Sequence, residues 1–256
     1  MEWKCCGASV MGSYHREGGI ACQDAHAIRV GAAGDLALVV ADGAGSASHS
    51  ALGAELLCQR VADALIGCPE APVEAVAEAV EIAIEELRGE LSSPGPETGE
   101  SSEGEATPGL RDYAATLVAC CLRPSGGVFV HIGDGAAIAM DSQAGEAQLI
   151  SPPENGEYAN ETFFFTMPSW REHLRVTSCG EEIDTVFLVS DGVTPLAVGK
   201  DGMPFMPFVQ PLHDHLVGWE RGEGERRVAA TLGSEQVDRI TGDDRTLVWA
   251  TRAMGG

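Results

Sequence analysis

The sequence predicts an α+β fold, a single domain over residues 1–256, in which antiparallel sheets pack together and helices lie outside them. Three observations predict this fold. Apolar runs of strand length recur along the chain, and several are separated by short turns that favour hairpins. Two long segments have apolar residues on one helical face only, so each needs a sheet to pack against. No internal repeat interrupts this alternation.

The bulk composition is that of an ordinary globular protein, with 44% hydrophobic and 21% charged residues. No apolar run reaches the roughly 18–20 residues of a membrane helix, and the N-terminal residues lack a signal-peptide pattern. We therefore expect a cytoplasmic protein. The eight cysteines include no Cys-x-x-Cys pair, which argues against a structural zinc site or a redox dithiol.

The net charge of −23 argues against nucleic acid and anionic membranes as partners, because their phosphates would be repelled. Two interpretations of this charge stay open at this point. The excess of carboxylates keeps the protein soluble, or some of the carboxylates bind divalent cations. The positions of the acidic residues decide between them, whereas their total number does not.

In the first half of the chain, apolar runs predict strands at 8–12, 26–30 and 35–41. A helix is predicted from Ser48, because Ala54, Leu57, Val61 and Leu65 fall on one stripe. A second helix is predicted from Pro72, a residue suited to the first turn of a helix. Its apolar positions repeat at helical spacing, and glutamates fill the opposite face.

Residues 92–109 contain no large apolar side chain and predict a flexible acidic loop. Beyond this loop, the pattern predicts strands at 115–122, 128–132, 136–140, 171–177, 185–189 and 245–250. Two helices are expected between the last two strands, near 207–219 and 224–239.

The phenylalanine run at 163–165 is more typical of a core than of a ligand platform, and His131 is expected to be packed or paired within its strand.

Three apolar strands run directly into Asp-Gly, at Asp42-Gly43, Asp134-Gly135 and Asp191-Gly192. A single Asp-Gly pair is a common turn signal and indicates little. As a set they indicate more, because a strand end holds each carboxylate rigidly and the glycine lets the backbone turn. Asp24 precedes another predicted strand, and Asp243 precedes the last one. Hard cations such as Mg²⁺ and Mn²⁺ prefer oxygen ligands of this kind, so the set predicts a metal cluster between sheets.

These motifs, in this order, resemble those of the metal-dependent protein phosphatase family, protein phosphatase 2C, and specifically its short bacterial-type branch. The resemblance extends from about residue 10 to residue 250, and an insert around 151–180 also looks like a flap of that branch. The segments that carry it are His15…Cys22-Gln-Asp24, Val40-Ala-Asp42-Gly-Ala-Gly-Ser, Ala115-Thr-Leu, Ile132-Gly-Asp134-Gly, Val189-Ser-Asp191-Gly-Val and Asp243-Asp-Arg-Thr-Leu.

The resemblance implies a four-layer α/β/β/α sandwich with a dimetal site between the two antiparallel sheets at one rim. Two Mg²⁺ or Mn²⁺ ions would share a water that attacks phosphorus in line. Asp42 would bridge the ions with the Gly43 carbonyl on one of them, and Asp191 and Asp243 would hold the other ion. Asp24 would bind through water, and Asp134 would contribute with Asp191 to a looser third metal site. Asp42, Asp191 and Asp24 would be the catalytic carboxylates.

A charge count supports this arrangement independently of the family. Asp24, Asp42, Asp191 and Asp243 supply a charge of about −4, which two divalent ions would balance. Without metal these carboxylates would repel one another, raising some pKa values and loosening the fold. We therefore expect the stability as well as the activity to depend on metal.

The sequence departs from the family pattern at three positions. Gln23 stands where a glutamate is usual, and it brings no charge to the metals. Gly19 stands where many members carry an arginine that binds substrate phosphate, so Arg16 or His15 is the candidate for that role. Ala44 replaces the histidine that better-known members have after Asp-Gly. Either water or another group then protonates the leaving group, or turnover is slow.

The function that these residues predict is hydrolysis of phosphoserine or phosphothreonine in a partner protein, counteracting a serine/threonine kinase in signalling. Two alternatives stay open. A pseudophosphatase of the same fold would act as a binding module, which Gln23 favours and the retained Asp42 and Asp191 disfavour. A phosphatase acting on small phosphorylated metabolites would use the same chemistry, because the substrate-binding loops vary independently of the fold.

Overall fold

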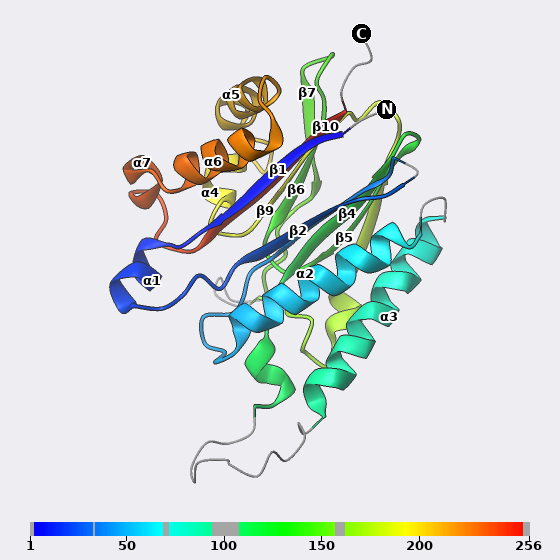
Figure 1. Cartoon of the computed structure of the whole chain (residues 1–256), viewed down its shortest axis with the longest axis vertical. Coiled ribbons are helices and arrows are strands. Elements are labelled where there is room, and N and C mark those ends of the chain that lie inside the picture. The colour runs from blue at the N-terminus through cyan, green and yellow to red at the C-terminus, as the bar shows by residue number, and fades with distance from the viewer. Residues whose placement is uncertain (1–2, 33, 69–71, 94–107, 157–161, 253–256) are drawn as a thin grey trace.

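The computed structural model describes residues 3–32, 34–68, 72–93, 108–156 and 162–252, and these form two five-stranded antiparallel sheets packed face to face (Figure 1). The first sheet has the order β1-β10-β9-β6-β7, with bounds Trp3–Val10, Arg245–Arg252, Thr185–Val189, Ala136–Asp141 and Glu146–Ser151. The second sheet has the order β2-β3-β4-β5-β8, with bounds Ala25–Val30, Leu36–Ala41, Leu117–Arg123, Gly126–Ile132 and Arg175–Cys179.

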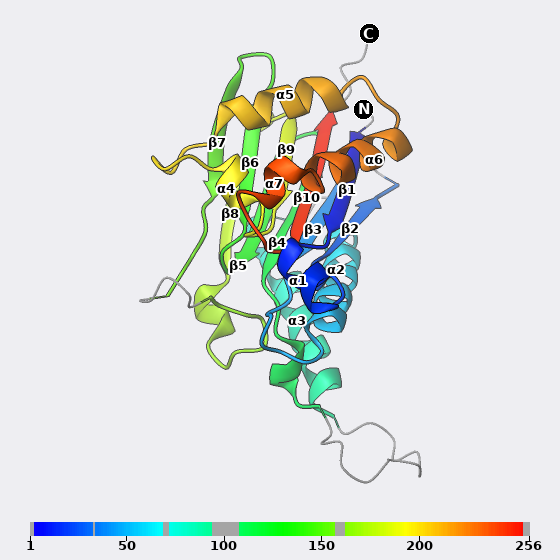
Figure 2. The same ribbon diagram turned by 90° about the vertical axis from the view of Figure 1, so that its left-hand side faces the viewer.

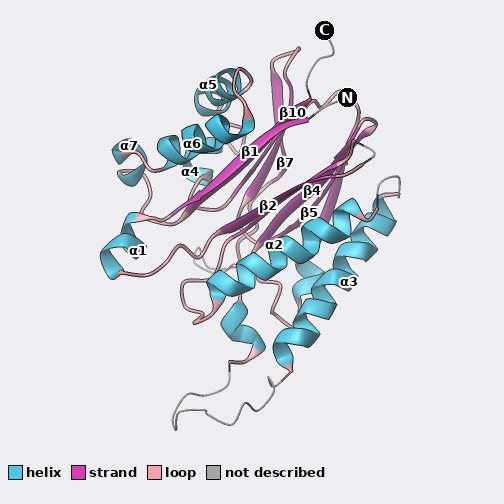
Figure 3. Cartoon of the chain, viewed as in Figure 1, coloured by secondary structure: helices cyan, strands magenta, loops and turns pink. Residues whose placement is uncertain are grey.

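Helices cover the outer faces of both sheets (Figures 1 and 3). The second sheet is covered by α2 (Ser50–Ile66) and α3 (Val73–Ser92), which lie side by side. The helices on the side of the first sheet are α4 (Thr194–Ala197), α5 (Met206–Leu216), α6 (Arg221–Leu232) and α7 (Glu235–Asp238). Figure 2 shows α1 (Ser13–Gly18) beyond the end of β1. Two short 3₁₀ helices, η1 (Leu110–Tyr113) and η2 (Trp170–His173), complete the described elements. The predicted four-layer α/β/β/α sandwich is confirmed.

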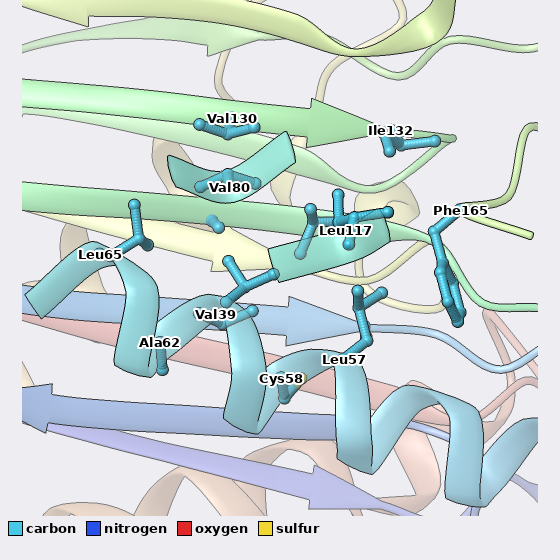
Figure 4. Packing of buried hydrophobic residues seen from close by; sticks show 14 of the residues in the cluster. Val39, Leu57, Cys58, Ala62, Leu65, Val80, Leu117, Val130, Ile132 and Phe165 are labelled. Carbon is cyan, nitrogen blue, oxygen red and sulfur yellow. The ribbon is translucent and has the colours of Figure 1, made fainter. Parts of the chain in front are cut away.

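Three separate apolar clusters fill the three interfaces between the four layers. In β3, Leu36, Leu38 and Val40 belong to the cluster between the sheets. The alternate residues of β3, such as Val39, face α2 and α3 (Figure 4). Because both faces of the strand are covered, it reads as a continuous apolar run, and each fully buried leucine contributes on the order of 2 kcal/mol.

The amphipathic stripes of the two long helices are buried as predicted. In α2, Leu57, Val61 and Leu65 are fully buried against the sheet, as Figure 4 shows for Leu57 and Leu65. In α3, Val80 and Ile84 are equally buried. Both helices bury one side only, which is what their sequence periodicity indicated.

The structure differs from the sequence prediction in several edge and end elements. The strand predicted at 8–12 lies at 3–10. It ends before Gly12, where a Cβ would come within 2.2 Å of the Gly242 carbonyl oxygen. Strand β7 was not predicted, since it is a half-exposed edge strand with a weak apolar pattern. The helix predicted at 224–239 is two helices, with α6 ending before Gly233 and α7 beginning after Ser234.

Two predicted segments lie partly outside the described residues. Of the acidic loop predicted at 92–109, residues 94–107 are not described, and of the insert predicted at 151–180, residues 157–161 are not described. The strand expected at 171–177 is preceded by η2 and runs over 175–179. None of the described helices combines the length and the apolar character that a membrane crossing requires.

Candidate metal centre and active site

The five aspartates selected from the sequence lie at strand ends on one rim of the sandwich. Asp42, Asp134 and Asp191 follow β3, β5 and β9, and Asp24 and Asp243 precede β2 and β10. The antiparallel pairs explain the convergence, because the start of β2 lies beside the end of β3, and the start of β10 lies beside the end of β9. The two sheets therefore deliver carboxylates to the same edge.

Three of these carboxylates are close enough to share a cation. One oxygen each from Asp42, Asp134 and Asp191 lies within 4.8 Å of the other two. Together with Gly43 and Asp243 they line a cavity of about 520 Å³. The lining also includes Gln23, His15 and Asp244. Asp24 is not part of this lining; it is 8% exposed, and the Ser190 hydroxyl donates a hydrogen bond of 2.7 Å to its Oδ2.

Backbone contacts fix the positions of Asp42 and Asp191. The Asp42 N–H donates to the Thr116 hydroxyl at 3.1 Å, and the Thr116 N–H donates back to the Asp42 carbonyl at 2.8 Å. Glycine is needed after Asp191, since a Cβ on Gly192 would lie 1.9 Å from the Asp244 carbonyl oxygen. This close approach is what brings the loop after β9 against the loop before β10.

Burial, and to a smaller extent mutual repulsion, disfavours the charged forms of the carboxylates. Burial raises the pKa of Asp191 to about 7, and Asp134, Asp24 and Asp243 add to the rise. Burial raises the pKa of Asp24 to about 6, although hydrogen bonds from Asp42 and Ser190 oppose the change. Burial, followed by the charges of Asp24 and Asp191, raises the pKa of Asp42 well above its ordinary value. The site is therefore short of positive charge.

The donor set fits hard divalent cations. Oδ1 of Asp24, Oδ1 of Asp134 and Oε1 of Gln23 are buried oxygens without a hydrogen-bond partner in the described part of the chain. Buried polar atoms of this kind are rare unless something else satisfies them. Carboxylate and amide oxygens are the ligands that Mg²⁺ and Mn²⁺ prefer, and Asp42, Asp191, Asp134 and Asp243 with the Gly43 carbonyl could hold such ions.

The two candidates for phosphate binding are placed differently. His15 lines the cavity, and its Nδ1 donates to Oδ2 of Asp244 at 2.8 Å. Among the described residues of the lining, His15 is the one side chain that can carry a positive charge. Arg16 is not part of the lining and instead donates to Oδ2 of Asp238 at 2.8 Å. The structure therefore brings His15 to the site and leaves Arg16 on the outer surface.

Asp244 is a site residue that the sequence analysis did not select. Its side chain accepts from the N–H groups of Gly12 (2.7 Å) and Gln23 (2.6 Å) as well as from His15. These three bonds attach the segment 12–23 to the start of β10. The available signal was its position beside Asp243, directly before the last strand.

A second missed residue, Arg175 on β8, holds the turn that carries Asp134. Its guanidinium donates to the carbonyl oxygens of Gly133 (3.2 Å) and Pro152 (2.6 Å). It also contacts the Glu154 carboxylate at 3.3 Å. His131 is fully buried beside it and bonded to Ser151, packed and paired as expected. No sequence motif indicated this role.

The phenylalanine run has a mixed role. Phe165 is fully buried in the core, as expected, and Phe163 stacks on His173 with ring centroids 3.4 Å apart. Phe164 instead lines the acidic cavity. The Thr162 hydroxyl donates a short hydrogen bond to Oδ2 of Asp134. The insert therefore contributes one wall of the site.

Fold and site together define a class of protein: a four-layer sandwich with an acidic, cation-suited cavity at the rim between its sheets. Residues 11–232 match the family model of protein phosphatase 2C. The chain belongs to the protein phosphatase 2C family.

Known relatives span the whole chain. Serine/threonine-protein phosphatase 3 of Escherichia coli K12 is 29% identical over 267 residues, covering 98% of this chain and 98% of the relative. The serine/threonine phosphatase of S. agalactiae has the same fold, with a TM-score of 0.66 at 14% identity over 98% of this chain and 100% of that one. PppA, a key regulatory component of T6SS in Pseudomonas aeruginosa, has a TM-score of 0.63 at 18% identity over 98% of each chain.

Proposed function

We propose that this protein is a Mg²⁺- or Mn²⁺-dependent phosphatase that removes phosphate from phosphoserine or phosphothreonine in a partner protein. The observation that carries the proposal is the approach of Asp42, Asp134 and Asp191 to within 4.8 Å of one another in a cavity open to substrate. The name of the Escherichia coli relative supports the substrate class. A cytoplasmic location and an opposing kinase belong to the same proposal.

Each residue has a defined task in this proposal. Asp42 and the Gly43 carbonyl, with Asp191 and Asp243, would hold two ions, Asp24 would act through water, and Asp134 would serve a third, looser position. Bound divalent ions would supply a water of lowered pKa as the nucleophile and would polarise the phosphoryl oxygens.

His15 would bind the substrate phosphate, because it is the one described side chain of the lining that can carry a positive charge and Asp244 holds its ring in one orientation. The role of Arg16 as an alternative phosphate ligand lacks support, since its guanidinium is bonded to Asp238. Ala44 offers no proton to a leaving alkoxide, so that proton has to come from solvent or from a neighbouring side chain.

The proposal is tested with p-nitrophenyl phosphate and a phosphothreonine peptide, assayed with Mn²⁺ and with EDTA. We expect release of phosphate that EDTA abolishes and that Asp42→Ala lowers at least a thousandfold. Glu146→Ala is the matched control, because Glu146 is an exposed acidic residue on β7, away from the cavity lining.

Three other results would contradict the proposal. Equal activity of Asp42→Ala and the unchanged protein would exclude this site. Activity on free phosphometabolites alone would show that the substrates are small molecules and not phosphoproteins. Binding to a phosphoprotein without any hydrolysis would favour a pseudophosphatase, which the neutral side chain of Gln23 at the cavity would then explain.

A further inference from the structure

A second, largely apolar cavity of about 430 Å³ adjoins the acidic one. We name it the flanking groove, and its lining includes Arg111, Ala114, Phe164, Met167 and Pro168. Phe164 and Met167 also line the acidic cavity, so the two hollows share a wall. A substrate segment whose phosphate lies among the aspartates would therefore continue over this groove.

The wall between the two cavities is held firmly by the rest of the fold. Phe165 is fully buried in the core under α2 and α3, and its N–H donates to the Ala115 carbonyl at 3.1 Å. Arg88 of α3 donates to the carbonyl oxygens of Phe165 (2.5 Å) and Met167 (3.0 Å). Phe164 and Met167 are thus presented by an anchored backbone, which lowers the entropic cost of binding.

Arg111, on η1, gives the groove a charge opposite to that of the molecule. Its side chain is exposed and has no hydrogen-bond or ion-pair partner within the described ranges of the chain. The protein as a whole has a net charge of −23, and the adjoining cavity is acidic. A carboxylate on a bound substrate would be repelled by most of this surface and attracted at Arg111.

We propose that the flanking groove is a specificity site for the protein substrate, taking an apolar side chain near the phosphorylated residue, with Arg111 contacting an acidic residue beside it. This inference rests on the proposed function and names the sequence context that the same site selects. Burying one apolar side chain in a preformed groove is the larger contribution, and the exposed ion pair is the smaller one.

The experiment compares phosphothreonine peptides that differ in one flanking residue, leucine against serine and glutamate against lysine, on each side of the phosphothreonine. With Mn²⁺ present, we expect kcat/KM to be about tenfold higher for the leucine peptide on one side. We expect glutamate to be preferred over lysine by about two- to fivefold. Each preference is a ratio measured on one enzyme preparation.

Substitutions then connect each ratio to the groove. Pro168→Asp places a charge on an exposed wall residue and should remove the leucine preference, and Arg111→Glu should reverse the glutamate preference. Arg239→Ala, at an exposed arginine directly after α7, is the control and should change neither ratio.

The possible failures are distinguishable. Hydrolysis of p-nitrophenyl phosphate together with equal kcat/KM for all the peptides would overturn the flanking groove and leave the phosphatase intact. No hydrolysis of any substrate would overturn the proposed function itself. Preferences that persist unchanged in both groove variants would place the specificity elsewhere and also overturn this inference.

Discussion

Replacing Asp191 with asparagine removes one negative charge from the crowded rim and should stabilise the metal-free protein. Burial, together with Asp134, Asp24 and Asp243, raises the pKa of Asp191 from 3.8 to about 7. At about 1.4 kcal/mol for each pKa unit, ionising this carboxyl in the folded protein costs ~4 kcal/mol. In EDTA at pH 8, we expect Asp191→Asn to melt roughly 10 °C above the unchanged protein.

The stabilisation of the metal-free protein by Asp191→Asn should decrease as the pH falls. Because the pKa of Asp191 is higher in the folded protein than its ordinary value of 3.8, the folded form binds the proton more tightly than the unfolded form. The carboxyl favours folding fully below pH 3.8, and this contribution is lost as the pH rises through about 7. Asparagine does not titrate, so its advantage at pH 8 should shrink by more than half at about pH 5.

Other groups change in the opposite direction, which makes the comparison between the two proteins essential. Burial lowers the pKa values of His26 and His131, so their contribution to stability is lost as the pH falls. Both histidines are present in both proteins, and subtracting the two melting curves removes their effect.

The assay is thermal melting at about pH 5 and pH 8, with EDTA or with excess Mn²⁺. Mn²⁺ should raise the melting temperature of the unchanged protein most at pH 8, where the carboxylates are ionised, and should raise that of Asp191→Asn much less. A metal-free Asp191→Asn protein no more stable than its parent at pH 8, or an advantage independent of pH, would refute the electrostatic reasoning.

Further predictions concern the groups around the carboxylates. Gly192→Ala should lower stability by about 3 kcal/mol or more in urea unfolding, because the new methyl group would meet the Asp244 carbonyl 1.9 Å away. His15→Gln should raise the KM for p-nitrophenyl phosphate about tenfold, whereas Arg16→Ala should leave it unchanged, and an equal effect of both would remove His15 from the site. Arg175→Gln should weaken Mn²⁺ binding about tenfold by calorimetry, because the turn before Asp134 loses its hydrogen bonds; unchanged affinity would limit Arg175 to a structural role.

The sequence was informative where a local pattern carries the physical cause. In α2 and β3, the spacing of apolar residues reflects which faces are covered, and both elements formed as predicted. Strand β7 escaped prediction because only one face of an edge strand is buried, which leaves a short and ambiguous pattern. The prediction of a single helix at 224–239 was wrong, because the apolar spacing continues across Gly233 although the helical backbone ends there.

The candidate site shows the same difference between local pattern and tertiary packing. The sequence identified the aspartates at strand ends, since an apolar strand that runs into Asp-Gly can be recognised within a few residues. It left open whether Arg16 or His15 reaches the cavity, because the course of helix α1 and the hydrogen bond between His15 and Asp244 decide that.

The amino-acid sequence by itself determined the layers of this protein, the residue types of its acidic site and the family it resembles, because these depend on periodicity and on short motifs. The tertiary structure alone decided that Asp244 joins three separate backbone and side-chain donors, that Arg175 holds the turn before Asp134, and that Arg111 borders an apolar groove. Such contacts join residues far apart along the chain, 232 positions for Gly12 and Asp244, and depend on how loops pack at the rim. No local pattern records that packing.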